Sequence, residues 1–325
     1  MMKYFFKILV ALAYVASLSS CGHQAAPQSE AHADESEKVN SIYYWRTVFN
    51  LDSAETAFLQ RHDVGRIYLR MFDIVPEHDF LNGTTDVVPN ATTQFVSSVP
   101  DGVEIVPVTY ITIEALRTMA GREAEIAPLI VERMLAMCSY NDCGEINELQ
   151  LDCDWTSSTK ESYEKLCGLV KESLHAKGIS LSITVRLHQL RETPPPADSG
   201  VLMLYNTGAL KRPDTRNSIL SYDDVEAYVR PIEYPMPLDY AYPVFGWGVK
   251  FAGNKFVSIV PYDSCLISGN EHVRYERPDA YTILNVKELV EENIGKPARG
   301  NILYHLDYSQ FKNYTDDEIS EIYSY

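Results

Sequence analysis

The sequence predicts an irregular (β/α)8 TIM-type barrel, in which helices surround a closed ring of parallel strands. Strand-like and helix-like segments alternate along residues 41–325 and give eight strand candidates. Those residues contain no Pro/Gly/Ser-rich linker long enough to divide them, so we expect a single domain. An open doubly wound sheet is the alternative fold, but no glycine-rich phosphate turn follows the first strand.

Residues 1–20 have the features of a signal peptide. Lys3 and Lys7 make the start positive, and the apolar run from Ile8 to Val15 is too short to span a bilayer. Leu18-Ser-Ser-Cys21 resembles a bacterial lipoprotein box, which implies cleavage before Cys21 and a lipid on its thiol; an ordinary signal peptide is the alternative. Residues 21–40 then form a flexible tether, because they are polar and lack apolar periodicity. We therefore expect an exported protein of the bacterial cell envelope, anchored to a membrane through Cys21.

Composition and charge narrow the classes of partner. The formal net charge of -17 argues against nucleic acid, because an acidic protein repels phosphate backbones. No cofactor is expected, since the chain carries neither a phosphate-binding loop nor a cluster with metal-ligand spacing. Cys138 and Cys143 bracket a short loop and are candidates for a disulfide in an exported protein.

The first half of the chain alternates clearly between strands and helices. Residues 41–47, 66–73, 104–111 and 148–155 are rich in β-branched and aromatic residues, as strands are. Asp52 and Glu55 predict a capping box for a helix that ends near residue 62. Helices are also expected over 124–137 and 159–176, and a short one over 94–98.

The pattern is weaker in the second half. Residues 180–187, 201–206, 238–244 and 301–306 supply the other four strands, and the three prolines at 194–196 predict a loop after the fifth. Residues 246–281 form an excursion that suits a hairpin. Three capping patterns predict helices over 221–229 and 285–294 and from Thr315 onward.

The stretch from Glu148 to Trp155 carries the strongest functional signal. Side chains alternate along a strand, so Gln150, Asp152 and Asp154 point to one face. Acids on one face of a buried strand are costly unless they are paired or used. In a (β/α)8 barrel the C-terminal ends of the strands hold the active site, which is where these two carboxylates fall.

The other strand ends add charged, aromatic and amide side chains. We expect substrate contacts from Arg46, Arg70, Tyr110, Arg186, His188, Tyr205, Asn206, Trp247 and Asp307. Both signs of charge and several aromatic rings suit a neutral, hydroxyl-rich ligand, and carbohydrate is the simplest of that type. A purely structural role, in which Asp152 and Asp154 pair with Arg70 or Arg186, is the alternative.

The alternating acids, Leu204-Tyr205-Asn206 and Trp247 together resemble the chitinase-type family 18 glycoside hydrolases. That family carries Asp-x-x-Asp-x-Asp-x-Glu on its fourth strand, with the Glu as proton donor, and a sixth-strand Tyr-Asp/Asn that holds the acetamido group. In one register the donor position falls on Thr156, which cannot protonate a glycosidic oxygen. In the other, Asp154 is the donor and Asp152 its partner.

The two registers predict different functions. With Asp154 as general acid, the protein is a lipid-anchored glycoside hydrolase of the cell envelope. With Thr156 at the donor position, it is a barrel that binds a glycan without cleaving it.

Overall fold

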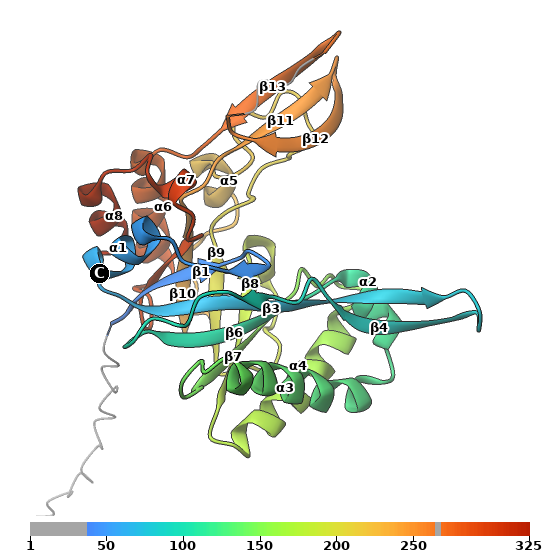
Figure 1. Cartoon of the computed structure of the whole chain (residues 1–325). Coiled ribbons are helices and arrows are strands. Elements are labelled where there is room, and N and C mark those ends of the chain that lie inside the picture. The colour runs from blue at the N-terminus through green and yellow to red at the C-terminus, as the bar shows by residue number, and fades with distance from the viewer. Residues whose placement is uncertain (1–37, 264–267) are drawn as a thin grey trace, which may run out of the picture. The chain divides into compact units, whose positions relative to one another are not determined.

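The structure, a computed structural model, describes residues 38–263 and 268–325, in which eight parallel strands close into a barrel. The barrel strands are β1 (Asn40–Tyr44), β3 (Val64–Asp79), β6 (Glu104–Ile111), β7 (Glu148–Asp152), β8 (Ser180–Arg186), β9 (Ser199–Met203), β10 (Leu238–Pro243) and β14 (Asn301–Tyr304). β1 pairs with β3 on one side and with β14 on the other, so the sheet has closed on itself (Figure 1). This confirms the predicted TIM-type barrel and excludes the open doubly wound sheet.

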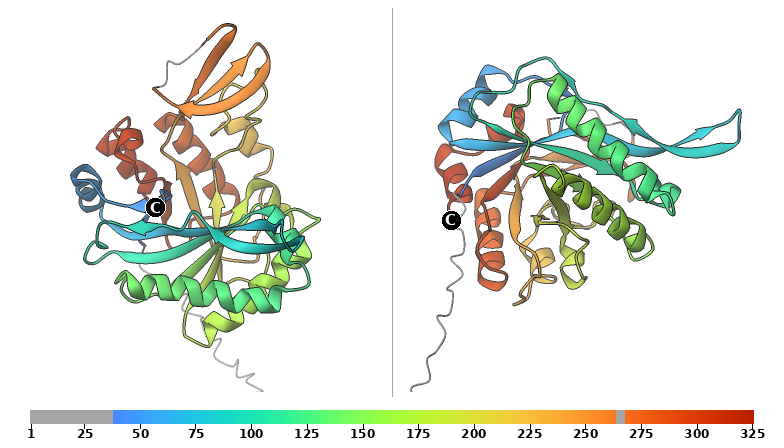
Figure 2. Two further views of the ribbon diagram at one scale, coloured as in Figure 1. Left: turned by 45° about the vertical axis from the view of Figure 1, so that its right-hand side comes forward. Right: turned by 90° about the horizontal axis from the view of Figure 1, so that it is seen from below.

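Helices cover the outside of the barrel, as the view from below shows for α3 and α4 (Figure 2). They are α1 (Ser53–Arg61), α2 (Ile113–Met119), α3 (Glu123–Tyr140), α4 (Lys160–His175), α5 (Tyr222–Glu226), α6 (Ala280–Asn293), α7 (Tyr308–Phe311) and α8 (Asp316–Tyr323), with a 3-10 helix, η1 (Leu187–Arg191), after β8. The predicted capping boxes at Asp52 and Thr315 are both present. In each, the side chain of the cap accepts from the backbone N–H of the third helical residue, and the side chain of that residue accepts from the backbone N–H of the cap.

Two structures project from the end of the barrel at which the strands finish (Figure 1). β3 continues beyond the barrel and forms a hairpin with β4 (Thr84–Asn90). After β10, the chain forms a three-stranded antiparallel sheet of β11 (Trp247–Ala252), β12 (Lys255–Pro261) and β13 (Glu271–Glu276). The excursion predicted over 246–281 is therefore a sheet and not a single hairpin.

Two further sequence predictions differ from the structure, and one element was not predicted. The short helix expected over 94–98 is wrong: β5 (Gln94–Phe95) pairs in parallel with β2 (Val48–Phe49), because Phe95 packs its ring on Phe49. The helix expected over 285–294 begins earlier, since the side chain of Asp279 caps it. The β3–β4 hairpin was not predicted, because its second strand is mostly polar and exposed.

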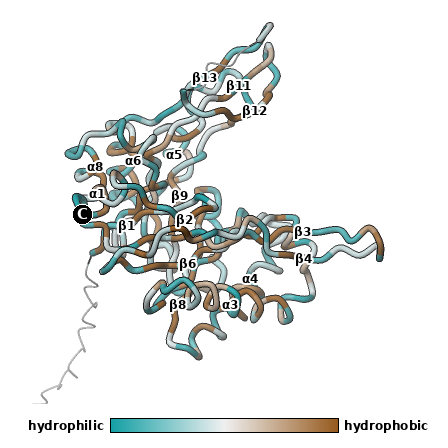
Figure 3. The backbone as a smooth tube through the Cα atoms, in the orientation of Figure 1, coloured by the Kyte–Doolittle hydropathy of each residue, from teal (hydrophilic) through white to brown (hydrophobic). Residues whose placement is uncertain are grey.

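Apolar residues fill the space between the strands and the helices, and Figure 3 shows hydrophobic segments running through the barrel strands. On β7, Leu149 and Leu151 are fully buried and alternate with inward-facing polar residues. The alternation places the helices' packing surface and the barrel interior on opposite faces of one strand.

The predicted signal at 1–20, the lipidation site Cys21 and most of the tether at 21–40 lie outside the described residues. None of the helices in the described ranges is long and apolar enough to span a bilayer.

Candidate functional site

Polar residues on β7 form a column through the interior of the barrel. The Gln150 amide accepts a hydrogen bond from the Tyr43 hydroxyl of β1 at 2.7 Å and donates one to Ser182 of β8 at 3.2 Å. Asp152, two residues on, accepts from the Thr184 hydroxyl of β8 at 2.6 Å. Both side chains therefore point inward, as the alternation along the strand predicts.

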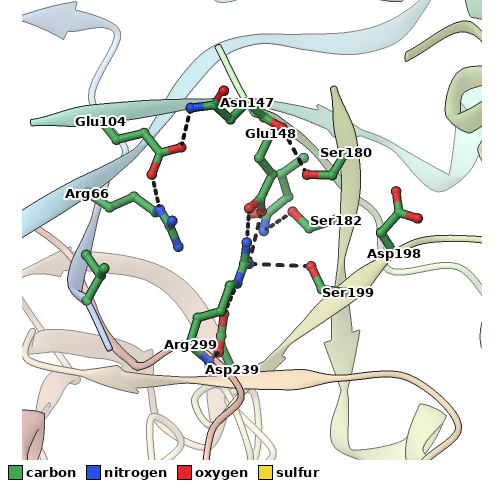
Figure 4. Close-up of polar contacts among 12 residues, drawn as sticks. Arg66, Glu104, Asn147, Glu148, Ser180, Ser182, Asp198, Ser199, Asp239 and Arg299 are labelled. Carbon is green, nitrogen blue, oxygen red and sulfur yellow. Dashed lines mark hydrogen bonds and ion pairs between the residues drawn. The ribbon is translucent and has the colours of Figure 1, made fainter. Parts of the chain in front are cut away.

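The column begins at the N-terminal end of the barrel, where Glu148 binds Arg299 (Figure 4). The Arg299 guanidinium also donates to Asp239 at 3.0 Å and to the Tyr68 hydroxyl at 3.2 Å. Every charge in this group has a partner of opposite sign. The N-terminal end of such a barrel is the end that serves stability, so the group closes the barrel and leaves the opposite end for function.

At the opposite end, the barrel mouth, one cation joins the two predicted carboxylates. Arg186, the last residue of β8, donates from Nη2 to Asp152 at 3.2 Å and from Nε to Asp154. The Asp152 side chain is 5% exposed, whereas that of Asp154 is 43% exposed. Asp154 is thus the carboxylate of the pair that a ligand at the mouth can reach.

Burial and charge set the ionisation of Asp152. Burial raises its pKa, the negative charge of Asp154 raises it further, and the positive charge of Arg186 opposes both. The same two carboxylates, after burial, raise the pKa of the Tyr110 phenol at the end of β6. Tyr110 pairs in register with Asp152, which places it beside the acids. Its raised pKa keeps the phenol neutral, so it remains a hydrogen-bonding group without charge.

Aromatic rings line the mouth opposite the acids. The Tyr304 ring, at the end of β14, lies 4.5 Å from that of Tyr205 and 5.9 Å from that of Trp45, measured between centroids. Phe245 packs on both Tyr304 and Trp247. Sequence reasoning named Tyr205 and Trp247 but missed Tyr304, Trp45 and Phe245, although each stands at or just beyond the end of a strand.

The predicted arginines divide between the mouth and its surroundings. Arg70 binds Asp73 through two hydrogen bonds of 2.9 and 2.5 Å, and its guanidinium lies 6.0 Å from the Trp45 ring centroid. Arg46 instead binds Glu55, the third residue of α1 and the partner of the cap Asp52, at 2.8 Å. Of the two arginines proposed as structural partners for the β7 acids, the structure pairs Arg186 with them and Arg70 with Asp73.

The other predicted site residues surround this cluster. Asn206 is exposed in a left-handed conformation with φ 56°, which Asn tolerates better than most residues, and His188 is exposed in η1. Trp247 donates its indole N–H to Glu276 at 2.9 Å. Asp307 caps α7 by accepting from the backbone of Ser309 at 2.9 Å.

Thr156, the other candidate for the donor position, belongs to the turn that leads into α4. Its hydroxyl lies 3.0 Å from that of Ser158, and its backbone N–H donates to the Thr159 hydroxyl at 3.0 Å. The hydroxyl and backbone of Thr156 therefore make hydrogen bonds within this turn, whereas Asp154 lies at the mouth and is bound by Arg186.

Within the described ranges, no group of three or more His, Cys, Asp or Glu residues is arranged to hold a metal ion. The mouth combines carboxylates, a guanidinium, phenols and aromatic faces. Such a surface can hydrogen-bond hydroxyl groups and stack on the apolar faces of sugar rings.

Known protein structures share this architecture, although the sequence itself has no match among family models or curated proteins. A chitinase from Chromobacterium violaceum aligns over 88% of this chain and 98% of its own, with 12% identity and a TM-score of 0.55. The family 18 chitinase ChiB of Flavobacterium johnsoniae aligns over 88% and 94%, with 12% identity and a TM-score of 0.52. The spore cortex-lytic enzyme SleL of Bacillus megaterium aligns over 90% and 75%, with 11% identity and a TM-score of 0.54.

These likenesses establish a shared fold. The chain has the barrel of the family 18 chitinases and of the cortex-lytic enzyme, as the resemblance in its sequence implies. Function does not follow from fold alone, so it must be argued from the mouth itself.

Proposed function

We propose that the protein binds a glycan at the barrel mouth and hydrolyses a glycosidic bond there, with Asp154 as the proton donor. The observation that carries the proposal is the contrast between the two β7 acids: Asp154 is accessible beyond the strand end, and Asp152 is buried behind it. A general acid must lie within hydrogen-bond reach of the leaving oxygen, and of these two carboxylates Asp154 is the one that a ligand can reach. The turn that holds Thr156 supports Asp154 as the donor.

The neighbouring residues have roles consistent with this reaction. Tyr205 and Asn206 follow β9, the sixth barrel strand, and match the Tyr-Asp/Asn pair with which the family 18 glycoside hydrolases hold the acetamido group. Tyr110 supplies a neutral hydroxyl beside the acids. Since chitinases are among the proteins with this fold, we take a chain containing N-acetylhexosamine as the substrate class.

Asp154→Asn tests the proposal. Hydrolysis of a fluorogenic chito-oligosaccharide should fall by roughly 100-fold or more, because the amide cannot protonate the leaving oxygen. Binding of the intact oligosaccharide, measured by calorimetry, should persist. Glu114→Gln, which neutralises an exposed acid on α2, is the matched control. Equal hydrolysis by the Asp154→Asn variant and the wild type would rule out Asp154 as the donor.

A second candidate function is glycan binding without cleavage, and the Arg186 ion pair is the observation that favours it. With Asp154 held by Arg186, the mouth offers hydrogen-bond acceptors and aromatic faces to a glycan, but no free side chain to protonate a glycosidic oxygen. Oligosaccharide binding by the wild type with no product at any pH between 4 and 8 would support this candidate over the hydrolase.

We also propose that Cys21 carries a lipid that anchors the protein to a membrane of the bacterial cell envelope. The lipoprotein-box sequence at 18–21 supports this. Cells fed an alkyne-labelled fatty acid should label the wild type but not the Cys21→Ala variant. Equal labelling of both would contradict the anchor.

A further inference from the structure

A cavity lies outside the mouth, between the chain that follows β9 and two helices. Its volume is about 670 Å³, and we call it the outer pocket. Its walls come from the segment 209–217, from Ser221 to Asp224 at the start of α5, and from Tyr281, Thr282 and Asn285 at the start of α6. None of these residues takes part in the site described above.

The outer pocket is on the same side of the barrel as the mouth. In a (β/α)8 barrel the helices run opposite to the strands, so the first residues of α5 and α6 lie at the end where the strands finish. Figure 1 shows α5 between β9 and the sheet of β11–β13. A chain molecule held at the mouth can therefore extend toward this pocket across one face of the protein.

Two tyrosines give the pocket aromatic surface. The Tyr281 side chain is 74% exposed and that of Tyr222 is 37% exposed, and both line the cavity. Large rings left open to water beside a polar cavity offer flat apolar faces, with a hydroxyl at the edge. Sugar rings pack on such faces while their hydroxyl groups remain hydrogen-bonded.

The polar lining has unused hydrogen-bonding capacity. The Asn217 side-chain oxygen accepts from the backbone of Ile219 at 2.9 Å, which leaves its NH2 group available. Asn285 is half-buried, and no residue in the described part of the chain hydrogen-bonds to its side chain. An amide placed against a cavity in this way suits a ligand with hydroxyl or amide groups.

The charges of the lining favour a neutral ligand. Arg212 is neutralised by Asp214 at 2.6 Å. Asp223 and Asp224 also line the cavity and face a single further cation, Arg216. The balance is slightly negative, which disfavours phosphate or other anions.

We propose that the outer pocket is a second glycan-binding site, which holds part of a polymer whose other part occupies the mouth. The inference rests on the proposed function for the class of ligand. It adds that the natural ligand is a chain long enough to reach both sites, and not a short oligosaccharide.

The experiment compares a polymer with a short ligand. Tyr281→Ala and Tyr222→Ala should each weaken the affinity for insoluble chitin or peptidoglycan about tenfold, because a ring face is lost. Co-sedimentation of the protein with the polymer measures this affinity. Hydrolysis or binding of chitotriose, which fills the mouth only, should stay within about twofold of the wild type. Tyr140→Ala is the matched control, since Tyr140 is 88% exposed at the end of α3.

The outcomes separate this inference from the proposed function. Equal binding of both polymers by Tyr281→Ala, Tyr222→Ala and Tyr140→Ala would overturn the second site, as would a wild type that binds neither polymer more tightly than chitotriose. Loss of polymer binding in the two pocket variants, with hydrolysis unaffected by Asp154→Asn, would support the second site while refuting Asp154 as the donor.

Discussion

Arg186 decides the chemistry of the mouth at the scale of single residues. Without it, two carboxylates two residues apart would repel each other in a poorly solvated place. The guanidinium binds both, fixing Asp154 in position and compensating the buried charge of Asp152. The sequence already offered Arg186 as one of two partners for these acids. The structure was needed to show which arginine binds them, because Arg70 forms its ion pair with Asp73, three residues away.

His305 gives the first prediction. Its Nδ1 atom is buried and has no hydrogen-bond partner in the described part of the chain, and burial lowers its pKa from 6.5 to about 4. The unfolded chain therefore binds a proton before the folded one does, and stability falls as the pH drops from 6.5 toward 4. Because part of the residue is exposed, we expect a loss of about 1 to 2 kcal/mol between pH 7 and pH 5.

Urea unfolding of the wild type and of His305→Gln at the two pH values measures this loss. The variant lacks the titrating ring, so its free energy of unfolding should change less over the same interval. Because all other ionisable groups are shared, the difference between the two proteins isolates His305. Parallel losses in both proteins would contradict the depressed pKa.

At the scale of elements, the sequence predicted all eight barrel strands, because buried strands are rich in β-formers and follow capped helices. It also placed Asp152 and Asp154 at the end of the correct strand, since side-chain alternation is a local property. The β3–β4 hairpin could not be predicted in the same way. Its second strand is polar and exposed, and it exists because β3 provides a partner.

Tyr304 illustrates why the site was predicted only in part. The sequence showed a tyrosine at the end of the last predicted strand, but a tyrosine in a strand usually packs in the core and does not bind a ligand. Its contacts with Tyr205 and Trp45, which are distant in sequence, depend on how the barrel closes. Closure brings together the ends of β14, β9 and β1, and no local pattern encodes it.

The end of α3 carries the second prediction. Cys138 and Cys143 are buried and not joined to each other, the backbone N–H of Cys143 donates to the Cys138 carbonyl at 3.0 Å, and the two thiols share a hydrogen bond. Oxidised glutathione should therefore join them: the two thiols lose two protons and two electrons, the S–S bond of glutathione breaks, and two glutathione thiols form. Closing so short a loop should stabilise the protein by about 2 kcal/mol.

Peptide mass spectrometry after oxidation, with unfolding curves of both forms, checks this disulfide. Cys167→Ser, which removes another buried thiol, should form the same cross-link as the wild type and gain a similar stability from it. Cys143→Ser should show neither the cross-link nor the added stability. A wild type in which Cys138 stays reduced or joins a different cysteine would contradict the prediction.

At the scale of the whole barrel, the two ends differ in how far their charged residues are buried. The N-terminal end is closed by Arg299, whose partners Glu148 and Asp239 have side chains only 2% and 3% exposed. The mouth has an exposed acid, buried and partly buried aromatic rings, and two projecting structures. A residue at the closed end should therefore govern stability, whereas one at the mouth should govern glycan binding.

Arg299→Met tests this division. Removing the cation leaves two buried carboxylates uncompensated, so the free energy of unfolding should fall by about 3 kcal/mol or more. Adding Glu148→Gln should recover part of the loss, because one of the unpaired charges is removed. At a temperature where the single variant remains folded, its affinity for chitotriose should match that of the wild type. Weaker binding by a folded Arg299→Met protein would mean that the polar column through Gln150 couples the two ends, so that the closed end also positions the acids at the mouth.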